Sequence, residues 1–315
     1  MERIISENAA VSDLSPDGKV EPTAVSDETL AKSGFYWRER GGVKVLVCRP
    51  LEEAGFANGF STRLGGVSNL AGGLELQASA DGYPVEGELN LAGFNEDAGD
   101  KIHENRRRFL AVFEAPYRLA LAWQVHGDNI RTVKNAEEAG DSDERADAVI
   151  SGLEGILAGV KTADCVPVLL GDPENMAFAA VHAGWRGTAL GIVGKTVEKM
   201  RTEFGTDPTS LIAAIGPAAG CEAYEIGHDV IDAFAEKFST GGKYFRETRP
   251  GHALFDLHAA NRDQLADAGV GAGNIPTAPF CTISRVDLFF SYRIEKKKFG
   301  RTGRLLSVIG KGRKA

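Results

Sequence analysis

The chain has 315 residues, a length typical of two domains, although single α/β domains also reach it. Its formal net charge of −8 argues against a nucleic-acid groove or an anionic membrane surface as the main partner. The sequence begins without the apolar core of a signal peptide, and no apolar run reaches the length of a membrane span. The four cysteines are far apart, which predicts reduced thiols in a cytoplasmic protein rather than a disulfide framework.

Residues 1–33 are polar, acidic and unpatterned, and we expect them to form a flexible N-terminal extension. From 34 to 315, short apolar runs alternate with amphipathic segments without an internal linker or repeat, which predicts a single mixed α/β domain. The predicted strands cover 43–49, 55–61, 119–125, 146–151, 155–162, 166–171, 177–183 and 211–216. The predicted helices cover 103–113, 187–200, 230–238 and 257–269.

The first segment that could bind a ligand is FSTRLGGVS, at 60–68. Its hydroxyls and guanidinium (Ser61, Thr62 and Arg63) precede a Gly-Gly turn, and together they could converge on an anion. A hairpin turn with exposed polar residues explains the same pattern. The segment FFSYR, at 289–293, presents the same alternatives with Ser291 and Arg293.

Three further motifs place a histidine or cysteine beside the end of a predicted strand. In WQVHG, His126 follows the run 119–125; in TADC, Cys165 precedes the run 166–171; in HAGWRG, His182 lies near the end of 177–183. If a sheet brings them to one edge, two imidazoles and a thiolate form a soft three-ligand site suited to Zn²⁺, with a fourth position open. Each motif is also explained by a tight turn or a buried small side chain.

Charged neighbours accompany two of these motifs. Asp164 directly precedes Cys165, and a carboxylate at a strand end is seldom placed there for packing. Arg186 lies at the start of the predicted helix 187–200, where free backbone N–H groups and the helix dipole favour an anion. The basic segment EKKKFGRTGR, at 295–304, is expected to be a solvated loop, with an anion-binding rim as the alternative.

The order of these motifs resembles that of the YfiH family, also called the laccase-domain or multicopper polyphenol-oxidase-like family. The resemblance covers about residues 44–310 and is carried by STRLGGVS, WQVHG, ADAVISG, TADCVPVLLGD, VHAGWRGTALGI, AAIGP, YEIG, FDLHAANRDQL and FFSYR. It implies a single α+β domain in which β-sheets pack between helical layers, a fold grouped with the toxin-type cysteine hydrolases. It also implies a zinc site formed by His126, Cys165 and His182.

The resemblance implies a purine nucleoside phosphorylase that cleaves adenosine, inosine and methylthioadenosine with phosphate and also deaminates adenosine. In that reaction scheme Asp164 is expected to be a general base or proton shuttle, with Arg63 beside it in the catalytic set. Phosphate and substrate are expected to contact Arg186 and Arg293 and, in addition, Ser61, Gln124 and Ser291. The expected protein is a monomer or homodimer that acts on small molecules rather than on nucleic acid or membranes.

Two other hydrolytic functions remain open from the sequence. Some family members are implicated in editing a UDP-muramoyl peptidoglycan precursor by removing wrongly incorporated serine. Alternatively, Cys165 is a nucleophile with His182 or His126 as its base. Copper laccase chemistry is disfavoured, because six histidines without any His-x-His pair are too few for a multicopper cluster.

Overall fold

A computed structural model describes residues 24–70, 87–92, 97–238 and 241–312. Most of the expected flexible extension, residues 1–23, lies outside these ranges. The remainder of that extension differs from the expectation, because Asp27–Lys32 forms helix α1 with Ser26 as its N-cap. Leu30 of this helix is 2% exposed and belongs to the main hydrophobic core, so the packed domain begins before residue 34.

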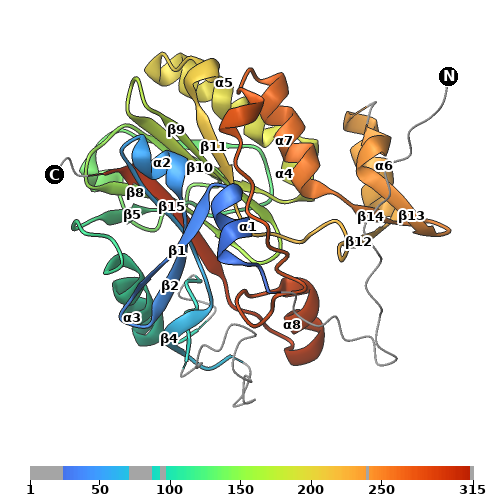
Figure 1. Cartoon of the computed structure of the whole chain (residues 1–315), viewed down its shortest axis with the longest axis horizontal. Coiled ribbons are helices and arrows are strands. Elements are labelled where there is room, and N and C mark those ends of the chain that lie inside the picture. Colours follow the sequence, from blue (N-terminus) through green and yellow to red (C-terminus); the bar gives the residue numbers. More distant parts are fainter. Residues whose placement is uncertain (1–23, 71–86, 93–96, 239–240, 313–315) are drawn as a thin grey trace.

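Two β-sheets pack against each other in the centre of the molecule (Figure 1). The six-stranded sheet has the order β1 (Phe35–Arg40), β2 (Val43–Cys48), β3 (Phe56–Ser61), β15 (Leu305–Lys311), β8 (Ile156–Thr162) and β5 (Arg118–Ala120). The five-stranded sheet has the order β11 (Ile212–Ile215), β9 (Val166–Asp172), β10 (Ala177–Ala183), β7 (Ala148–Ser151) and β6 (Ile130–Val133). Strand β4 (Leu64–Ser68) follows β3.

Helices cover the outer faces of both sheets (Figure 1). On the five-stranded sheet these are α4 (Trp185–Ala189), α5 (Ile192–Phe204) and α7 (Leu257–Asp267), and on the six-stranded sheet α3 (Gly99–Leu110). The shorter α2 (Arg49–Glu53) packs against β3, and α8 (Tyr292–Phe299) precedes β15. Helix α6 (His228–Lys237) lies with a three-stranded sheet, β12 (Glu225–Gly227), β14 (His252–Phe255) and β13 (Phe245–Arg249). The predicted mixed α/β fold is confirmed.

Strand β10 shows how the sequence builds this layering. Because successive side chains of a strand point to opposite faces, Phe178 and Ala180 enter the core between the sheets, whereas Ala179 and Val181 pack under the helices. His182 continues the first series and therefore faces the inter-sheet side. The imidazole of a candidate metal ligand is thus placed by the same alternation that forms the core.

Three segments differ from the predicted secondary structure. The run 119–125 is strand only to Ala120, which also bridges to Gly140, and Trp123 makes one further isolated bridge to Arg145. The helix expected over 187–200 is two helices, because Gly191 adopts φ 77° between them. The basic segment at 295–304 is not all loop, since α8 extends to Phe299 and places three lysines in its last turn, where the helix dipole favours cations.

Arg63 lies in the interior, at the connection between β3 and β4, and only 2% of it is exposed. Its guanidinium forms ion pairs with Glu88 and, at 2.7 Å, with Glu295. It also donates a hydrogen bond of 2.6 Å to the Val286 carbonyl and lies 4.6 Å from the centre of the Phe290 ring. Two carboxylates already balance its charge, so Arg63 joins β3 to α8 and is not free to hold a phosphate as expected.

None of the helices in the described ranges combines the length and the apolar character that crossing a bilayer requires.

Replacing the buried arginine tests this assignment. Arg63→Ala removes the cation buried between the Glu88 and Glu295 carboxylates, and we expect the free energy of unfolding to fall by about 3–5 kcal/mol. Chemical denaturation measures the change. Lys32→Ala is the control, because its pair with Glu28 is exposed and should be worth no more than about 0.5 kcal/mol. A loss below about 1 kcal/mol for Arg63→Ala would show that the buried charges are not coupled in this way.

Candidate metal centre

The register of the five-stranded sheet brings two of the candidate ligands together. Strands β9 and β10 pair antiparallel, with His182 opposite Pro167 and Ala183 opposite Val166. One further step along this register places Cys165 opposite Gly184, just beyond the end of the sheet. The short spacing between TADC and HAGWRG in the sequence therefore becomes direct proximity of the Cys165 and His182 side chains.

Gly184 leaves the space that the Cys165 thiol needs. A Cβ atom at residue 184 would lie 2.9 Å from the Cys165 sulfur and 3.1 Å from Cδ2 of His126. Both distances are shorter than ordinary van der Waals contacts. The glycine after the strand is therefore required for the approach of the two ligands, in addition to starting α4.

His126 comes from a different edge of the same sheet, in the turn before β6. Its backbone has φ 61°, a left-handed conformation that is uncommon for a residue with a side chain. Within the described ranges only Asp164 and Met176 share this feature among non-glycine residues. Two of the three strained residues thus lie at the candidate site, consistent with the tendency of backbone strain to accumulate at functional positions.

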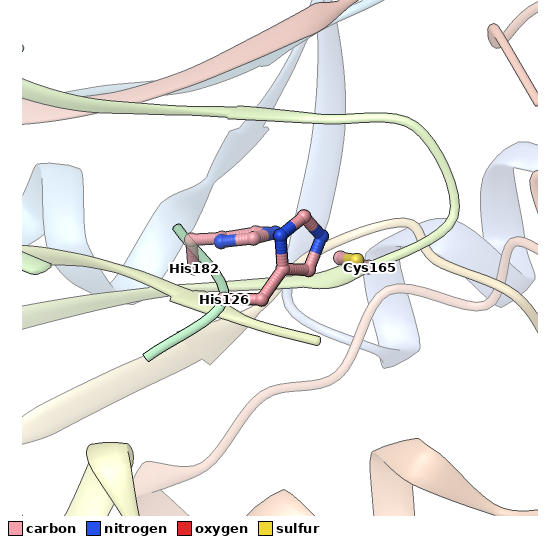
Figure 2. Close-up of side chains that lie close together, drawn as sticks. All are labelled: His126, Cys165 and His182. Atoms are coloured by element: carbon pink, nitrogen blue, oxygen red, sulfur yellow. The ribbon is translucent and has the colours of Figure 1, made fainter. Parts of the chain in front are cut away.

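The three side chains meet at one point, although they come from three separate segments (Figure 2). The ligand atoms of His126, Cys165 and His182 all lie within 4.8 Å of one another. The two imidazole rings have centroids 4.8 Å apart and an interplanar angle of 78°. His182 is buried, Cys165 is partly buried and His126 is exposed, so the cluster is accessible from the side of His126.

The Asp147 carboxylate, fully buried just before β7, orients both histidines. One oxygen accepts a hydrogen bond from Nδ1 of His182 at 2.8 Å and one from the backbone N–H of His126 at 2.9 Å. The other oxygen accepts from the backbone N–H groups of Gly127, at 2.7 Å, and Val125, at 3.2 Å. With Nδ1 of His182 engaged, its Nε2 is left as the ligand atom, which is the usual arrangement behind metal-bound histidines.

The charges within the cluster favour a thiolate. Burial alone would raise the pKa of Cys165, but the adjoining His182 and His126 rings outweigh burial and lower that pKa to about 6. Burial would lower the pKa of His182, whereas the Cys165 thiolate and the Asp147 carboxylate raise it to about 9. A cysteine binds metals as the thiolate, and a metal competes with the proton on His182. The donor set, its spacing and its second layer of hydrogen bonds therefore fit a soft or borderline cation.

The two exposed arginines among the expected site residues lie around this cluster. Arg186 lies two residues after Gly184, and its guanidinium carbon is 4.3 Å from the centre of the Trp185 ring. Arg293 lies 5.1 Å over the Tyr224 ring and donates to the Glu225 carbonyl at 2.6 Å. Neither guanidinium pairs with a carboxylate among the residues that the structure describes.

Two other expected residues have backbone partners instead. Ser61 is 1% exposed, and its hydroxyl accepts the N–H of Leu306 at 2.9 Å, which joins β3 to β15. Gln124 exchanges two hydrogen bonds of 2.7 Å with the backbone of Lys161 and so fixes the loop that carries His126. The side chains of Ser61 and Gln124 therefore stabilise loops and strands around the site.

Asp164 and Ser291 are in direct contact. The Asp164 carboxylate accepts hydrogen bonds from the Ser291 hydroxyl at 3.1 Å, from the Thr282 hydroxyl at 2.7 Å and from the backbone N–H of Arg293 at 2.7 Å. Burial raises the pKa of Asp164, and these three donors oppose that rise without cancelling it. The FFSYR segment is thus attached to the TADC turn.

Asp147, Thr282 and Tyr224 are not among the site residues predicted from the sequence. Asp147 had a detectable signal, since it stands in ADAVIS directly before a predicted strand, as Asp164 stands before β9. Tyr224 directly precedes β12 and Thr282 lies in a loop, both in segments for which no strand was predicted, and only the tertiary structure brings Thr282 to Asp164.

With this geometry established, similarity to known proteins identifies the family. The model of the family described as "Multi-copper polyphenol oxidoreductase laccase" matches residues 57–311. The chain belongs to this family. The relationship confirms the resemblance stated from the motifs.

Similar curated proteins have enzymatic names. The chain is 37% identical over 225 residues to "Purine nucleoside phosphorylase" of Xylella fastidiosa, and the aligned region covers 70% of this chain and 84% of that protein. It is 33% identical over 266 residues to "Purine nucleoside phosphorylase YfiH" of Escherichia coli, covering 84% of this chain and 98% of the relative.

Solved structures of the family have the same fold. YlmD from Geobacillus stearothermophilus superimposes with a TM-score of 0.74 at 30% identity, covering 89% of this chain and 99% of YlmD. A Bacillus licheniformis hypothetical protein YfiH gives the same TM-score at 27% identity, covering 88% of this chain and 98% of that one.

The hydrogen bonds of Asp147 predict its effect on the metal centre. Asp147→Asn keeps the shape of the side chain but removes the charge and replaces one acceptor oxygen by a donor. We expect metal affinity to fall about 10–100-fold, the usual result of losing such an outer partner. Competition with a chromophoric chelator measures affinity, and ¹⁵N NMR of the metal-free protein reports the His182 tautomer.

Asp172→Asn is the matched control, because Asp172 is a buried aspartate at the other end of β9. It should leave metal affinity unchanged. Equal losses of affinity in the two variants would indicate general destabilisation and contradict a specific role for Asp147.

Proposed function

We propose that the protein is a zinc-dependent purine nucleoside phosphorylase that also deaminates adenosine. The observation that carries this proposal is the convergence of His126, Cys165 and His182 in a chain whose curated relatives are named purine nucleoside phosphorylase. The proposed substrates are adenosine, inosine and methylthioadenosine together with phosphate, in the reducing cytoplasm that free cysteines favour.

Zinc is the ion we propose for this site. Two imidazoles and one thiolate are common zinc ligands, and three protein ligands are typical of catalytic rather than structural zinc. When bound, zinc would supply Lewis acidity at an open fourth position. The family description mentions copper, but six histidines without a His-x-His pair do not provide the ligands of a multicopper cluster.

Arg186 and Arg293 are the residues that we propose for phosphate. In phosphorolysis a phosphate oxygen bonds to C1′ of the sugar while the bond from C1′ to the purine breaks, and its electron pair leaves with the base. Both guanidiniums are exposed beside the cluster and have no carboxylate partner in the described part of the chain, so their charge is available to the anion. Arg63 is left out of this set, because Glu88 and Glu295 already bind it.

A second candidate function follows from the low pKa of Cys165. A thiolate flanked by two imidazoles can also be the nucleophile of a hydrolase, with His182 or His126 as its base. The arrangement of Asp147 behind His182 suits either a metal ligand or such a base. Metal analysis and product analysis distinguish the two functions.

Purified protein should contain about one zinc per chain, held by three ligands. Cys165→Ala and His182→Ala should both lose the metal and the phosphorolysis activity, whereas Cys48→Ala, a buried cysteine of β2, should keep both. Inductively coupled plasma mass spectrometry gives the metal content. An active, metal-free protein that accumulates a covalent intermediate on Cys165 would exclude the phosphorylase proposal in favour of the hydrolase.

The products provide the second part of this test. With adenosine and phosphate we expect adenine and ribose 1-phosphate, together with inosine, ammonia and hypoxanthine from deamination, and without phosphate we expect only inosine and ammonia. Chromatography of the reaction with and without a chelator identifies them. Free ribose as the sugar product in the presence of phosphate would contradict phosphorolysis.

A further inference from the structure

Asp164 connects the turn that carries Cys165 to a segment more than 100 residues further along the chain. Its three donors, the Thr282 and Ser291 hydroxyls and the Arg293 N–H, stand 118, 127 and 129 positions away. Only 9% of Asp164 is exposed.

The backbone of Asp164 is held in an unfavourable conformation. Its φ of 82° is in the left-handed region, which costs a residue with a Cβ atom on the order of 1–2 kcal/mol. The N–H of Ala219 donates to the Asp164 carbonyl at 2.9 Å and helps to fix this conformation. Because Asp164 is buried and accepts hydrogen bonds from three residues of a distant segment, it clamps the TADC turn to that segment.

The clamp fixes the start of α8. Ser291 is the N-cap of this helix and accepts the N–H of Ile294 at 3.4 Å, while its own hydroxyl donates to Asp164. The N–H of Arg293 is one of the free donors at a helix N-terminus, and Asp164 accepts it. The position of Arg293 along the helix is therefore set by Asp164.

The side chain of Arg293 extends from this fixed backbone over Tyr224. Its guanidinium lies 5.1 Å from the ring centre and donates to the Glu225 carbonyl at 2.6 Å. The Tyr224 ring also stacks with Phe255, with centroids 6.0 Å apart and planes 19° from parallel. The cation and the ring are thus held against each other by contacts from three elements.

The Tyr224 hydroxyl is a further donor near the metal ligands. Burial raises the pKa of Tyr224 to about 12, with added contributions from the negative charges of Cys165 and Asp164, and Arg293 and Arg186 oppose the rise. The hydroxyl stays protonated at neutral pH and makes no hydrogen bond within the described part of the chain. Since the Arg293 guanidinium lies 5.1 Å from the centre of the same ring, the hydroxyl and this cation belong to one surface.

We propose that Asp164 is a positioning residue, and that the surface it sets, the Arg293 guanidinium with the Tyr224 hydroxyl, binds the phosphate substrate. This inference rests on the phosphorylase function proposed above. It differs from the expectation that Asp164 is the general base, because a base must reach a proton of the substrate, whereas this carboxylate is turned to three protein donors.

The inference is tested by separating phosphate binding from turnover. Asp164→Asn retains the left-handed backbone, which asparagine tolerates, but weakens the hold on Ser291 and Arg293. With saturating inosine, we expect the KM for phosphate to rise about tenfold, the effect of losing a charge-assisted hydrogen bond, while kcat changes by about twofold or less. Tyr224→Phe keeps the ring beneath Arg293 and should raise the same KM. Calorimetry with inorganic phosphate should show the same losses in binding.

A double-mutant cycle shows whether Asp164 acts through Arg293. In an Arg293→Gln background, Asp164→Asn should have little further effect on the KM for phosphate. Asp172→Asn, outside the site, is the control for loss of a buried carboxylate. If Asp164→Asn instead lowers kcat by about 100-fold or more at unchanged phosphate affinity, in both backgrounds, Asp164 is the base and the inference is wrong.

Two further measurements separate failure of this inference from misfolding of the Asp164→Asn variant and from failure of the proposed function. If Asp164→Asn does not fold or loses its metal, Ser291→Ala removes a single contact of the clamp and should raise the KM for phosphate in the same direction; an unchanged KM would overturn the inference. If the wild-type protein neither binds inorganic phosphate nor forms ribose 1-phosphate, the proposed function fails. If it does both, and the Asp164 and Tyr224 variants keep wild-type phosphate affinity, only the present inference fails.

Discussion

The candidate metal centre depends on the hydrogen bonds that the fully buried Asp147 carboxylate accepts. This carboxylate accepts the N–H of the His182 ring and three successive backbone N–H groups around His126, so one side chain fixes the orientation of one ligand and the backbone of another. Four donors compensate the cost of burying this charge and bring the pKa of Asp147 below its usual value, against the effect of burial. The left-handed conformation of His126 is stable only while these contacts hold it.

Much of the fold could be predicted from local patterns. Strands β9 and β10 and helix α7 were found because their apolar periodicity and capping residues are encoded within a few neighbouring positions. The run 119–125 was predicted too long, because its apolar composition suits a strand but its partners beyond Ala120 are only isolated bridges. The split at Gly191 depends on one residue with positive φ, which the continuous apolar spacing of the segment conceals.

For the candidate site, the sequence allowed the three candidate metal ligands to be grouped but did not allow the roles of the charged residues to be assigned. His126, Cys165 and His182 could be grouped because each flanks a strand, and strand ends meet at the edges of sheets. The roles of the charged residues could not be separated, since Arg63 and Arg293 follow similar Ser-containing motifs but differ in tertiary partners. Glu88 and Glu295 bind Arg63, whereas Arg293 lies over an aromatic ring beside the cluster. Sequence spacing carries no information on such distant pairings.

The central claim is that His126, Cys165 and His182 together bind one zinc ion. X-ray absorption at the zinc edge of the purified protein tests it most directly, because sulfur and nitrogen ligands differ in distance. We expect one sulfur at about 2.3 Å and two imidazole nitrogens at about 2.0–2.1 Å, with the sulfur lost in Cys165→Ser. A spectrum with nitrogen and oxygen ligands only, or one unchanged by Cys165→Ser, would contradict the account.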